Sequence, residues 1–125
     1  MLLYHYSNED IKNGFIKPEL FGSNAHTPKQ TGVNRSYYYI DPDYREKFFL
    51  GARYRYIIEI KDILEAYIYD LSTDDLNIIE GGCIADNLIK LRDNLGYIGV
   101  KYKSHTGNEI VALFYKMKYI KKEVL

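Results

Sequence analysis

Two side chains of this 125-residue chain stand where an extended backbone could present them for chemistry. His5 lies in the middle of an apolar N-terminal stretch, and Glu109 opens the apolar stretch that ends at Tyr115. An imidazole binds hydroxyl groups or moves protons near neutral pH, and a carboxylate stabilises a developing positive charge. Taken alone, each has a simpler explanation, because His5 fits a strand core or edge and Glu109 fits a solvated strand end.

Three consecutive tyrosines, Tyr37, Tyr38 and Tyr39, form a third candidate feature. Because side chains alternate between the two faces of a strand, at least one of these rings must point away from the core. That ring is either ordinary amphipathic surface or a platform on which a flat ligand stacks. Alternation alone does not decide which of the three it is.

Several common signatures are absent from the sequence. It has neither a GxGxxG nor a P-loop motif, so no glycine loop for phosphate is indicated. The histidines His5, His26 and His105 are far apart, which argues against a zinc site. Cys83 is the only cysteine, and we interpret it as a packing residue. A lone thiol excludes an internal disulfide and favours a reducing compartment.

Charge and composition narrow the function classes. The chain has 17 Lys and Arg and 17 Asp and Glu, and a formal net charge of zero argues against nucleic-acid binding. The basic tail, which holds Lys116, Lys118, Lys121 and Lys122, is explained by a solvated edge strand. No apolar run approaches the roughly 18 residues of a membrane span, and no secretory signal is seen, so a cytoplasmic protein is expected.

Hydrophobic patterning predicts an α+β fold in a single domain, residues 1–125. About six strands are expected, at residues 2–6, 36–40, 53–60, 66–70, 97–100 and 109–115, in a split, two-sheet β core. One main helix is predicted over 84–95, where Ile84, Leu88, Leu91 and Leu95 form one face and Gly96 ends it. A turn that starts one irregular helical turn is expected at Ser7–Asp10, and short helical pieces are expected at 42–50 and after Ser72. A functional loop or a set of short pieces is expected over residues 13–34.

The order of four short motifs is the most specific signal. His5-Tyr6-Ser7 lies on the first strand and Tyr38-Tyr39-Ile40 on the second. Near the C-terminus, Leu95-Gly96-Tyr97-Ile98-Gly99-Val100 precedes Glu109-Ile110-Val111-Ala112-Leu113-Phe114. In this order, the chain resembles the small ADP-ribosyltransferase-like domains of the histidine–tyrosine–glutamate type. The phage-encoded anti-CRISPR ADP-ribosyltransferases are similar to it in size and in the arrangement of their motifs.

The resemblance implies an ADP-ribosyltransferase-like fold and an NAD-dependent mono-ADP-ribosyltransferase with Glu109, His5 and Tyr38 as catalytic residues. Glu109 would stabilise the oxocarbenium-like cation that forms when nicotinamide leaves. His5 would bind the adenosine-side ribose, and Tyr38 or Tyr39 would stack on nicotinamide. The other implied NAD contacts are Tyr6, Ser7, Asn24, Thr27 and Arg35. Arg35 suits the diphosphate best, because guanidinium matches phosphate geometry.

Two departures from the family pattern shape the expected partner. Tyr6 stands where glycine is usual, and Gly107 stands where the arginine-modifying branch has Glu or Gln, which argues against an arginine acceptor. A protein target is expected, for a phage or bacterial toxin or anti-defence protein acting in the cytoplasm. One alternative is an inactive nucleotide-binding or protein-binding inhibitor module of the same fold. Another is a small RNA-directed toxin, including an RNA phosphotransferase.

Overall fold

The computed structural model describes residues 1–19, 33–44, 50–78, 84–104 and 106–125, and the side chains of 84–86 are left aside. It is mostly sheet with two helices, so the predicted α+β class is confirmed. The strands are β1 (Leu2–Ser7), β2 (Phe15–Ile16), β3 (Ser36–Tyr39), β4 (Tyr54–Glu59), β5 (Ile68–Asp70), β6 (Gly99–Lys103), β7 (Glu109–Leu113), β8 (Met117–Lys118) and β9 (Lys121–Val124). The helices are α1 (Asp62–Glu65) and α2 (Ile84–Asp93).

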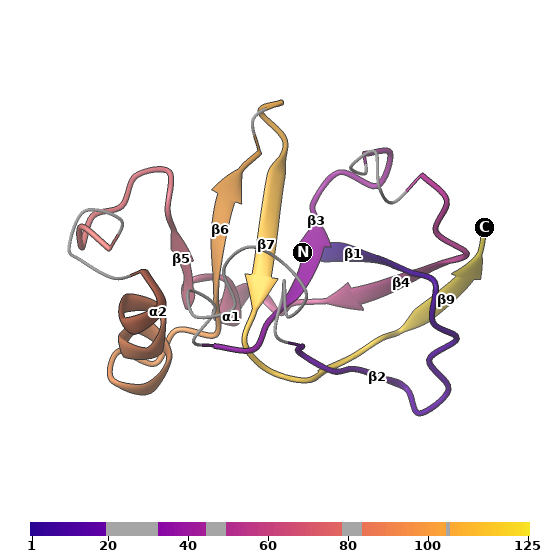
Figure 1. Ribbon diagram of the computed structural model, residues 1–125, viewed down its shortest axis with the longest axis horizontal. Coiled ribbons are helices and arrows are strands. Elements are labelled where there is room, and N and C mark those ends of the chain that lie inside the picture. The colour runs from indigo at the N-terminus through magenta and orange to yellow at the C-terminus, as the bar shows by residue number, and fades with distance from the viewer. Residues whose placement is uncertain (20–32, 45–49, 79–83, 105) are drawn as a thin grey trace.

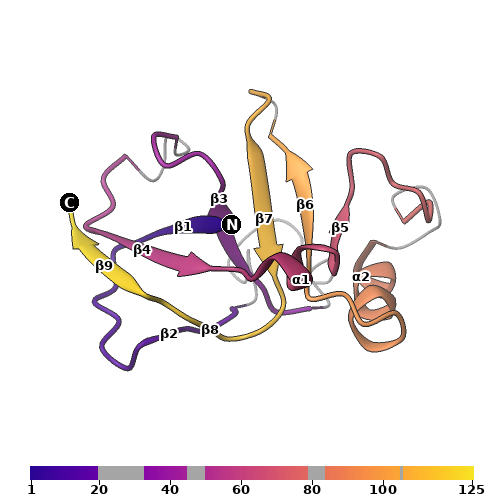
Figure 2. The same cartoon turned by 180° about the vertical axis from the view of Figure 1, so that it is seen from behind.

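The strands form two sheets, as predicted. The large sheet has the order β5-β6-β7-β3-β1-β4-β9, and the small one pairs β2 with β8. Among the described strands, only β5 and β6 pair in parallel. Figures 1 and 2 show that β5, β6 and β7 run in a clearly different direction from β1, β4 and β9. The described strands number nine rather than about six, because β2 and β8 form short additional strands and β9 forms in the basic tail. β9 lies at the edge of the large sheet, as the solvated edge strand expected for that tail.

The large sheet is almost divided between β1 and β3. β1 pairs with β4 along its whole length, from Leu2 opposite Glu59 to Ser7 opposite Tyr54. In contrast, β1 and β3 share a single pair of partners, Tyr4 and Tyr39. Because β1 and β3 pair at only one position, other backbone groups along this junction need hydrogen-bond partners outside the ladder. The sheet therefore changes direction at this junction, next to His5.

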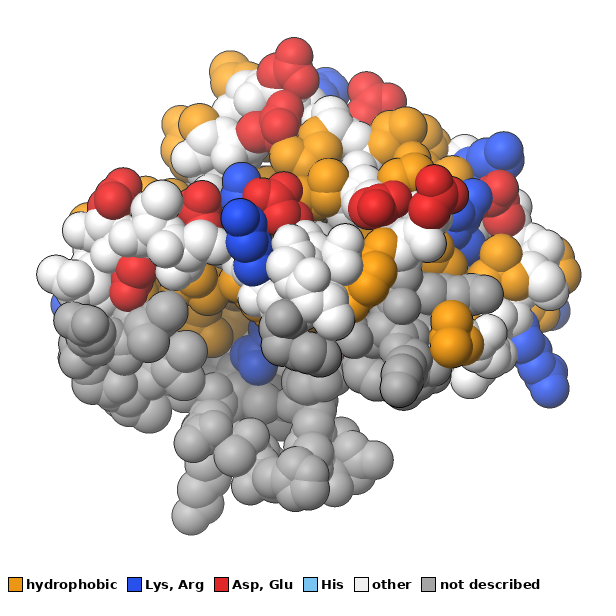
Figure 3. Space-filling model, turned by 90° about the horizontal axis from the view of Figure 1, so that it is seen from above, with side chains coloured by type: hydrophobic (Ala, Val, Ile, Leu, Met, Phe, Trp, Pro, Cys, Tyr) orange, Lys and Arg blue, Asp and Glu red, His pale blue; other side chains and the backbone are white. Residues whose placement is uncertain are grey.

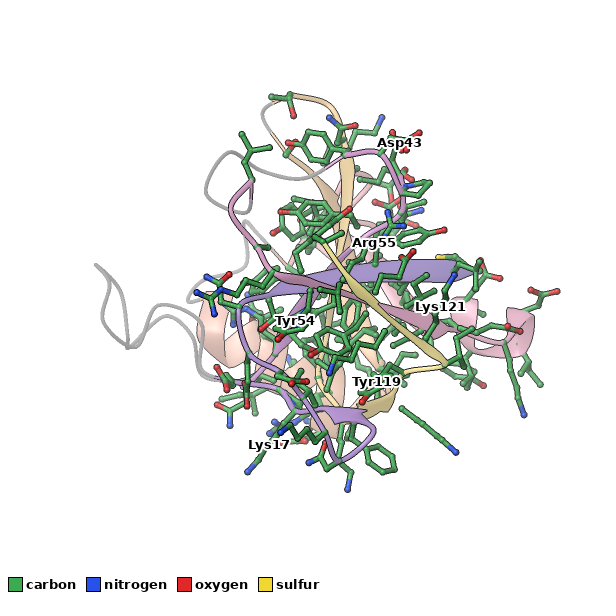
Figure 4. The ribbon with its side chains drawn as sticks, turned by 90° about the vertical axis from the view of Figure 1, so that its right-hand side faces the viewer. Lys17, Asp43, Tyr54, Arg55, Tyr119 and Lys121 are labelled. Carbon is green, nitrogen blue, oxygen red and sulfur yellow. The ribbon has the colours of Figure 1, made fainter. Side chains whose placement is uncertain are left out.

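Both faces of the large sheet are packed. One face buries Leu3, Tyr38, Tyr56 and Val111 beneath Ile16 of the small sheet. The other packs Leu88 and Leu91 of α2 against β5, β6 and β7, beside a second cluster around Tyr6 and Tyr39. Figure 4 shows the two sides at β4, where Arg55 lies on the side of Asp43 and Tyr54 on the side of Tyr119. We call the face that carries Tyr38 and Tyr56 the histidine face, because His5 lies on it.

The main helix begins where the periodicity predicts, and Leu88 and Leu91 are buried as expected. It ends at Asp93, and Gly96 follows in a left-handed conformation with φ of 75°. Leu95 was expected on the buried face of the helix. It is 49% exposed, because the helix ends before it. None of the helices that the structure describes is long and apolar enough to cross a membrane.

Two predicted helical pieces are wrong. Ser7 ends β1, and its Oγ accepts a hydrogen bond from the Glu9 amide, which makes a turn instead of a helix start. After Ser72 the chain forms turns, because Asp74 adopts a left-handed φ of 46° that an α-helix does not contain. The piece predicted at 42–50 lies largely outside the described residues. Helix α1 was not anticipated, and it buries none of its four residues.

Candidate functional site

The register brings the three main candidate residues to adjacent strands. His5 on β1 lies opposite Tyr56 on β4, and Tyr38 on β3 lies opposite Val111 on β7. Since Tyr4 pairs with Tyr39, His5 and Tyr38 are neighbours across the β1–β3 junction. Glu109 precedes Val111 by two residues and so shares its face.

The histidine face therefore carries His5, Tyr38 and Glu109 on three consecutive strands. Glu109 lies two residues along β7 from Val111, so it is offset from His5 toward the open end of β7. Tyr38 lies on the strand between them.

The tautomer of His5 follows from its hydrogen bond. Nδ1 lies 2.7 Å from the backbone oxygen of Tyr37 on β3. A carbonyl oxygen only accepts, so Nδ1 carries a proton and Nε2 of the neutral ring is an acceptor. Burial lowers the pKa of His5 below its usual 6.5, against smaller raising effects of this hydrogen bond and of Glu9. Within the described part of the chain, Nε2 has no hydrogen-bond partner.

Aromatic rings flank His5 on both neighbouring strands. The ring centroids of Tyr38 and Tyr56 lie 5.3 and 6.4 Å from that of His5. Tyr38 has no exposed surface, and its hydroxyl accepts a hydrogen bond from Ser36 at 3.1 Å. Burial raises the pKa of Tyr38 well above its usual 10.0. The expected exposed tyrosine ring is therefore not found at position 38.

Glu109 stands at the open end of β7. Its side chain is 40% exposed, and its Oε1 lies 3.9 Å from Nζ of Lys101 on β6. Figure 3 looks onto this end of the molecule and shows Asp and Glu side chains interspersed with Lys and Arg side chains.

The turn before Glu109 is held from two sides. Gly107 supplies a left-handed φ of 87°, which closes the turn between β6 and β7. The Thr106 hydroxyl lies 2.9 Å from the Tyr44 hydroxyl and 2.7 Å from that of Ser104. The hairpin that carries Glu109 is thus tied to the segment that follows β3.

The other predicted NAD contacts divide between the two faces. Ser7 shares the histidine face, because it pairs with Tyr54. Tyr6 and Tyr39 pack together on the opposite face, with ring centroids 5.8 Å apart. Their side chains are thus separated from His5 by the sheet, and we leave them out of the site.

The predicted diphosphate contacts are not brought to His5 either. The guanidinium of Arg35 binds the Tyr37 hydroxyl at 2.6 Å, and Tyr37 extends the same opposite face. Asn24 and Thr27 lie outside the described residues. Of the three predicted diphosphate contacts, the described residues thus include only Arg35, whose guanidinium lies with Tyr37 on the face opposite to His5.

Two residues on the histidine face were missed by the sequence analysis. Tyr56 adjoins His5, and Lys101 adjoins Glu109. Alternation along β4 and β6 shows which neighbours Tyr56 and Lys101 share a face with on their own strands. However, only the register between strands shows which side they share with His5. In the described residues, no cluster of His, Cys, Asp and Glu could hold a metal ion.

Comparison of the chain with known protein families, curated proteins and solved structures gives no match. What chemistry the site could perform is therefore judged from its own geometry. The site offers a neutral imidazole acceptor, held between two buried aromatic rings, and a partly exposed carboxylate on the same face of the sheet. Such a set can accept hydrogen bonds from sugar hydroxyls and stabilise a sugar cation, and it lacks an evident nucleophile.

Proposed function

We propose that this protein is an NAD-dependent ADP-ribosyltransferase with an ADP-ribosyltransferase-like fold. The observation that carries the proposal is the common face of His5, Tyr38 and Glu109 on three adjacent strands. The same three residues carry the sequence resemblance to the histidine–tyrosine–glutamate type. Tyr38 is 33 positions from His5 in the sequence and 71 positions from Glu109, yet the three residues share one face of the sheet.

The proposed reaction breaks the bond between nicotinamide and ribose, and the bonding electrons leave with the nicotinamide nitrogen. Glu109 accepts a hydrogen bond from a hydroxyl of the nicotinamide ribose and stabilises the oxocarbenium-like cation. Nε2 of His5 accepts a hydrogen bond from a hydroxyl of the adenosine-side ribose. Tyr38 has no exposed surface, and its part is to support the His5 imidazole from the neighbouring strand, with ring centroids 5.3 Å apart.

The proposed acceptor is a protein side chain other than arginine, because Gly107 replaces the upstream Glu or Gln of the arginine-modifying branch. A toxin or anti-defence protein, encoded by a phage or a bacterium and acting in the cytoplasm, is the corresponding biological role. Intact-mass analysis of candidate targets after incubation with NAD tests it. An added ADP-ribose on a protein supports the proposal.

The first test of catalysis is Glu109→Gln, which removes the charge and keeps the size. Loss of one electrostatic stabiliser of a transition state costs roughly 100–1,000-fold in rate, and we expect that loss in nicotinamide release. Glu59→Gln is the matched control, because Glu59 is an exposed carboxylate at the end of β4 on the other face. Full activity of Glu109→Gln would remove Glu109 from the mechanism.

A second function, a binding module without transfer activity, is favoured by one observation. Tyr38 has no exposed surface, so no open ring awaits nicotinamide in this conformation. Calorimetry with NAD, run beside a nicotinamide-release assay, separates the two functions. Binding that depends on His5 without nicotinamide release supports the module, and release supports the transferase.

A further inference from the structure

A line of three charged side chains crosses the edge of the histidine face. Asp70 on β5, Lys101 on β6 and Glu109 on β7 come from three adjacent strands. Nζ of Lys101 lies 3.9 Å from Oδ2 of Asp70 and 3.9 Å from Oε1 of Glu109. One ammonium group thus stands between two carboxylates, at a distance where the charges attract without a hydrogen bond.

The line is anchored at the Asp70 end. Asp70 is the direct neighbour of Lys101 in the parallel pair, and its Oδ1 accepts a hydrogen bond from the Ser72 amide at 2.8 Å. A carboxylate held by a backbone amide is less free to rotate than one in solvent. It therefore limits where the long Lys101 side chain places its charge.

The pairing with Glu109 is selective within the β6–β7 ladder. The direct cross-strand partner of Glu109 is Lys103, yet the ion pair forms with Lys101, the diagonal neighbour. Diagonal neighbours across a ladder are within reach of long side chains. Lys103 is exposed and makes no ion pair in the described part of the chain.

We propose that Lys101, anchored by Asp70, is a positioning residue for the Glu109 carboxylate. The inference rests on the proposed transferase function. Lys101 holds Oε1 toward β6, which leaves Oε2 to accept the hydrogen bond from the ribose hydroxyl. The residue acts through Glu109 and needs no contact with NAD.

The experiment compares Lys101→Met with Lys103→Met in the nicotinamide-release assay over a range of NAD concentrations. A misplacement of about 1 Å costs up to about 100-fold in rate. Exposed ion pairs hold groups only weakly, so we expect kcat of Lys101→Met to fall about 10-fold. KM for NAD should stay within about twofold, as for an interaction made only in the transition state. Lys103→Met should resemble the unsubstituted protein.

Three further variants distinguish positioning from general structural damage. Lys101→Arg should restore most of kcat, since the cation is kept. Asp70→Asn should lower kcat by severalfold, and adding it to Lys101→Met should cause no further loss, because the two residues act in one line. The thermal midpoint of each variant should match that of Lys103→Met.

The outcomes separate this inference from the proposed function. If Glu109→Gln abolishes turnover and Lys101→Met does not lower kcat, the positioning role is wrong and the transferase function stands. If Lys101→Met raises KM and leaves kcat unchanged, Lys101 binds NAD instead and the inference is overturned. If the unsubstituted protein releases no nicotinamide, the proposed function and this inference fail together.

Discussion

At the scale of single residues, His5 shows how one side chain serves the fold and the candidate site together. Its Nδ1–H supplies a hydrogen bond to Tyr37 where the β1–β3 ladder is almost absent. This use of Nδ1 leaves Nε2 for a ligand. The structural role of His5 therefore uses Nδ1, which is satisfied by the Tyr37 oxygen. The proposed functional role uses Nε2.

The protonation of His5 yields a stability prediction. Because burial lowers its pKa in the folded state below 6.5, the unfolded chain takes up this proton first as the pH falls. The free energy of unfolding should thus decrease below about pH 6.5, by at most about 1.4 kcal/mol per pH unit for one group. Denaturant unfolding from pH 7 to 5 should show a smaller decrease for His5→Gln. An identical pH dependence in both proteins would contradict the assigned burial.

At the scale of elements, the β6–β7 pair depends on one close approach. A Cβ on Gly99 would lie 2.3 Å from the backbone oxygen of Ala112 and 2.8 Å from Cδ2 of Leu113. Glycine at position 99 thus lets β6 approach β7, and these strands carry Lys101 and Glu109. The Leu-Gly-Tyr-x-Gly-Val motif of the sequence has this packing role at its second glycine.

Gly99→Ala should destabilise the protein by about 1–3 kcal/mol, the usual cost of overpacking. Gly51→Ala is the control, because a Cβ there meets nothing within 4 Å and its φ is not left-handed. The control should be neutral or stabilising by about 0.4–1 kcal/mol through the unfolded state. Chemical denaturation measures both, and equal stability of the two variants would refute the close approach.

At the scale of the whole molecule, the abundance of tyrosine has a structural explanation. Tyrosine rings fill the core while their hydroxyls bind the surrounding backbone. Tyr56 donates to the Glu9 oxygen, Tyr119 to the Ile11 oxygen and Tyr6 to the Pro42 oxygen. Each bond ties a loop to the sheet. Most of these rings are therefore accounted for by packing, not by ligand stacking.

This arrangement predicts alkaline unfolding. Burial is the largest cause that raises the pKa values of Tyr38, Tyr56 and Tyr69 above 10.0 in the folded state. Above pH 10 the unfolded chain loses these protons first, so stability is retained below pH 10 and lost as the pH rises further. Near-ultraviolet tyrosinate absorbance should rise in two phases, the second coinciding with the loss of circular dichroism. Tyr38→Phe should reduce the second phase.

Much of the fold was predictable because its signals are local. Alternation in residues 2–6 placed His5 with Leu3 and away from Tyr4 and Tyr6, and the structure confirms this. The spacing of Leu88 and Leu91 located α2. The burial of Tyr38 was not predictable, since either parity of the three tyrosines satisfies the pattern. The small sheet was missed because two-residue strands carry no periodicity.

The sequence by itself determined which side chains share a face within each strand, because that depends only on the twofold repeat of the extended backbone. It could not determine which strands are neighbours or in what register they pair, because those depend on contacts between distant segments. The tertiary structure decided that β3 lies between β1 and β7. It also decided that Lys101, and not Lys103, faces Glu109 as its ion-pair partner. Cross-strand pairing thus assembled the candidate site from residues whose individual patterns were ordinary.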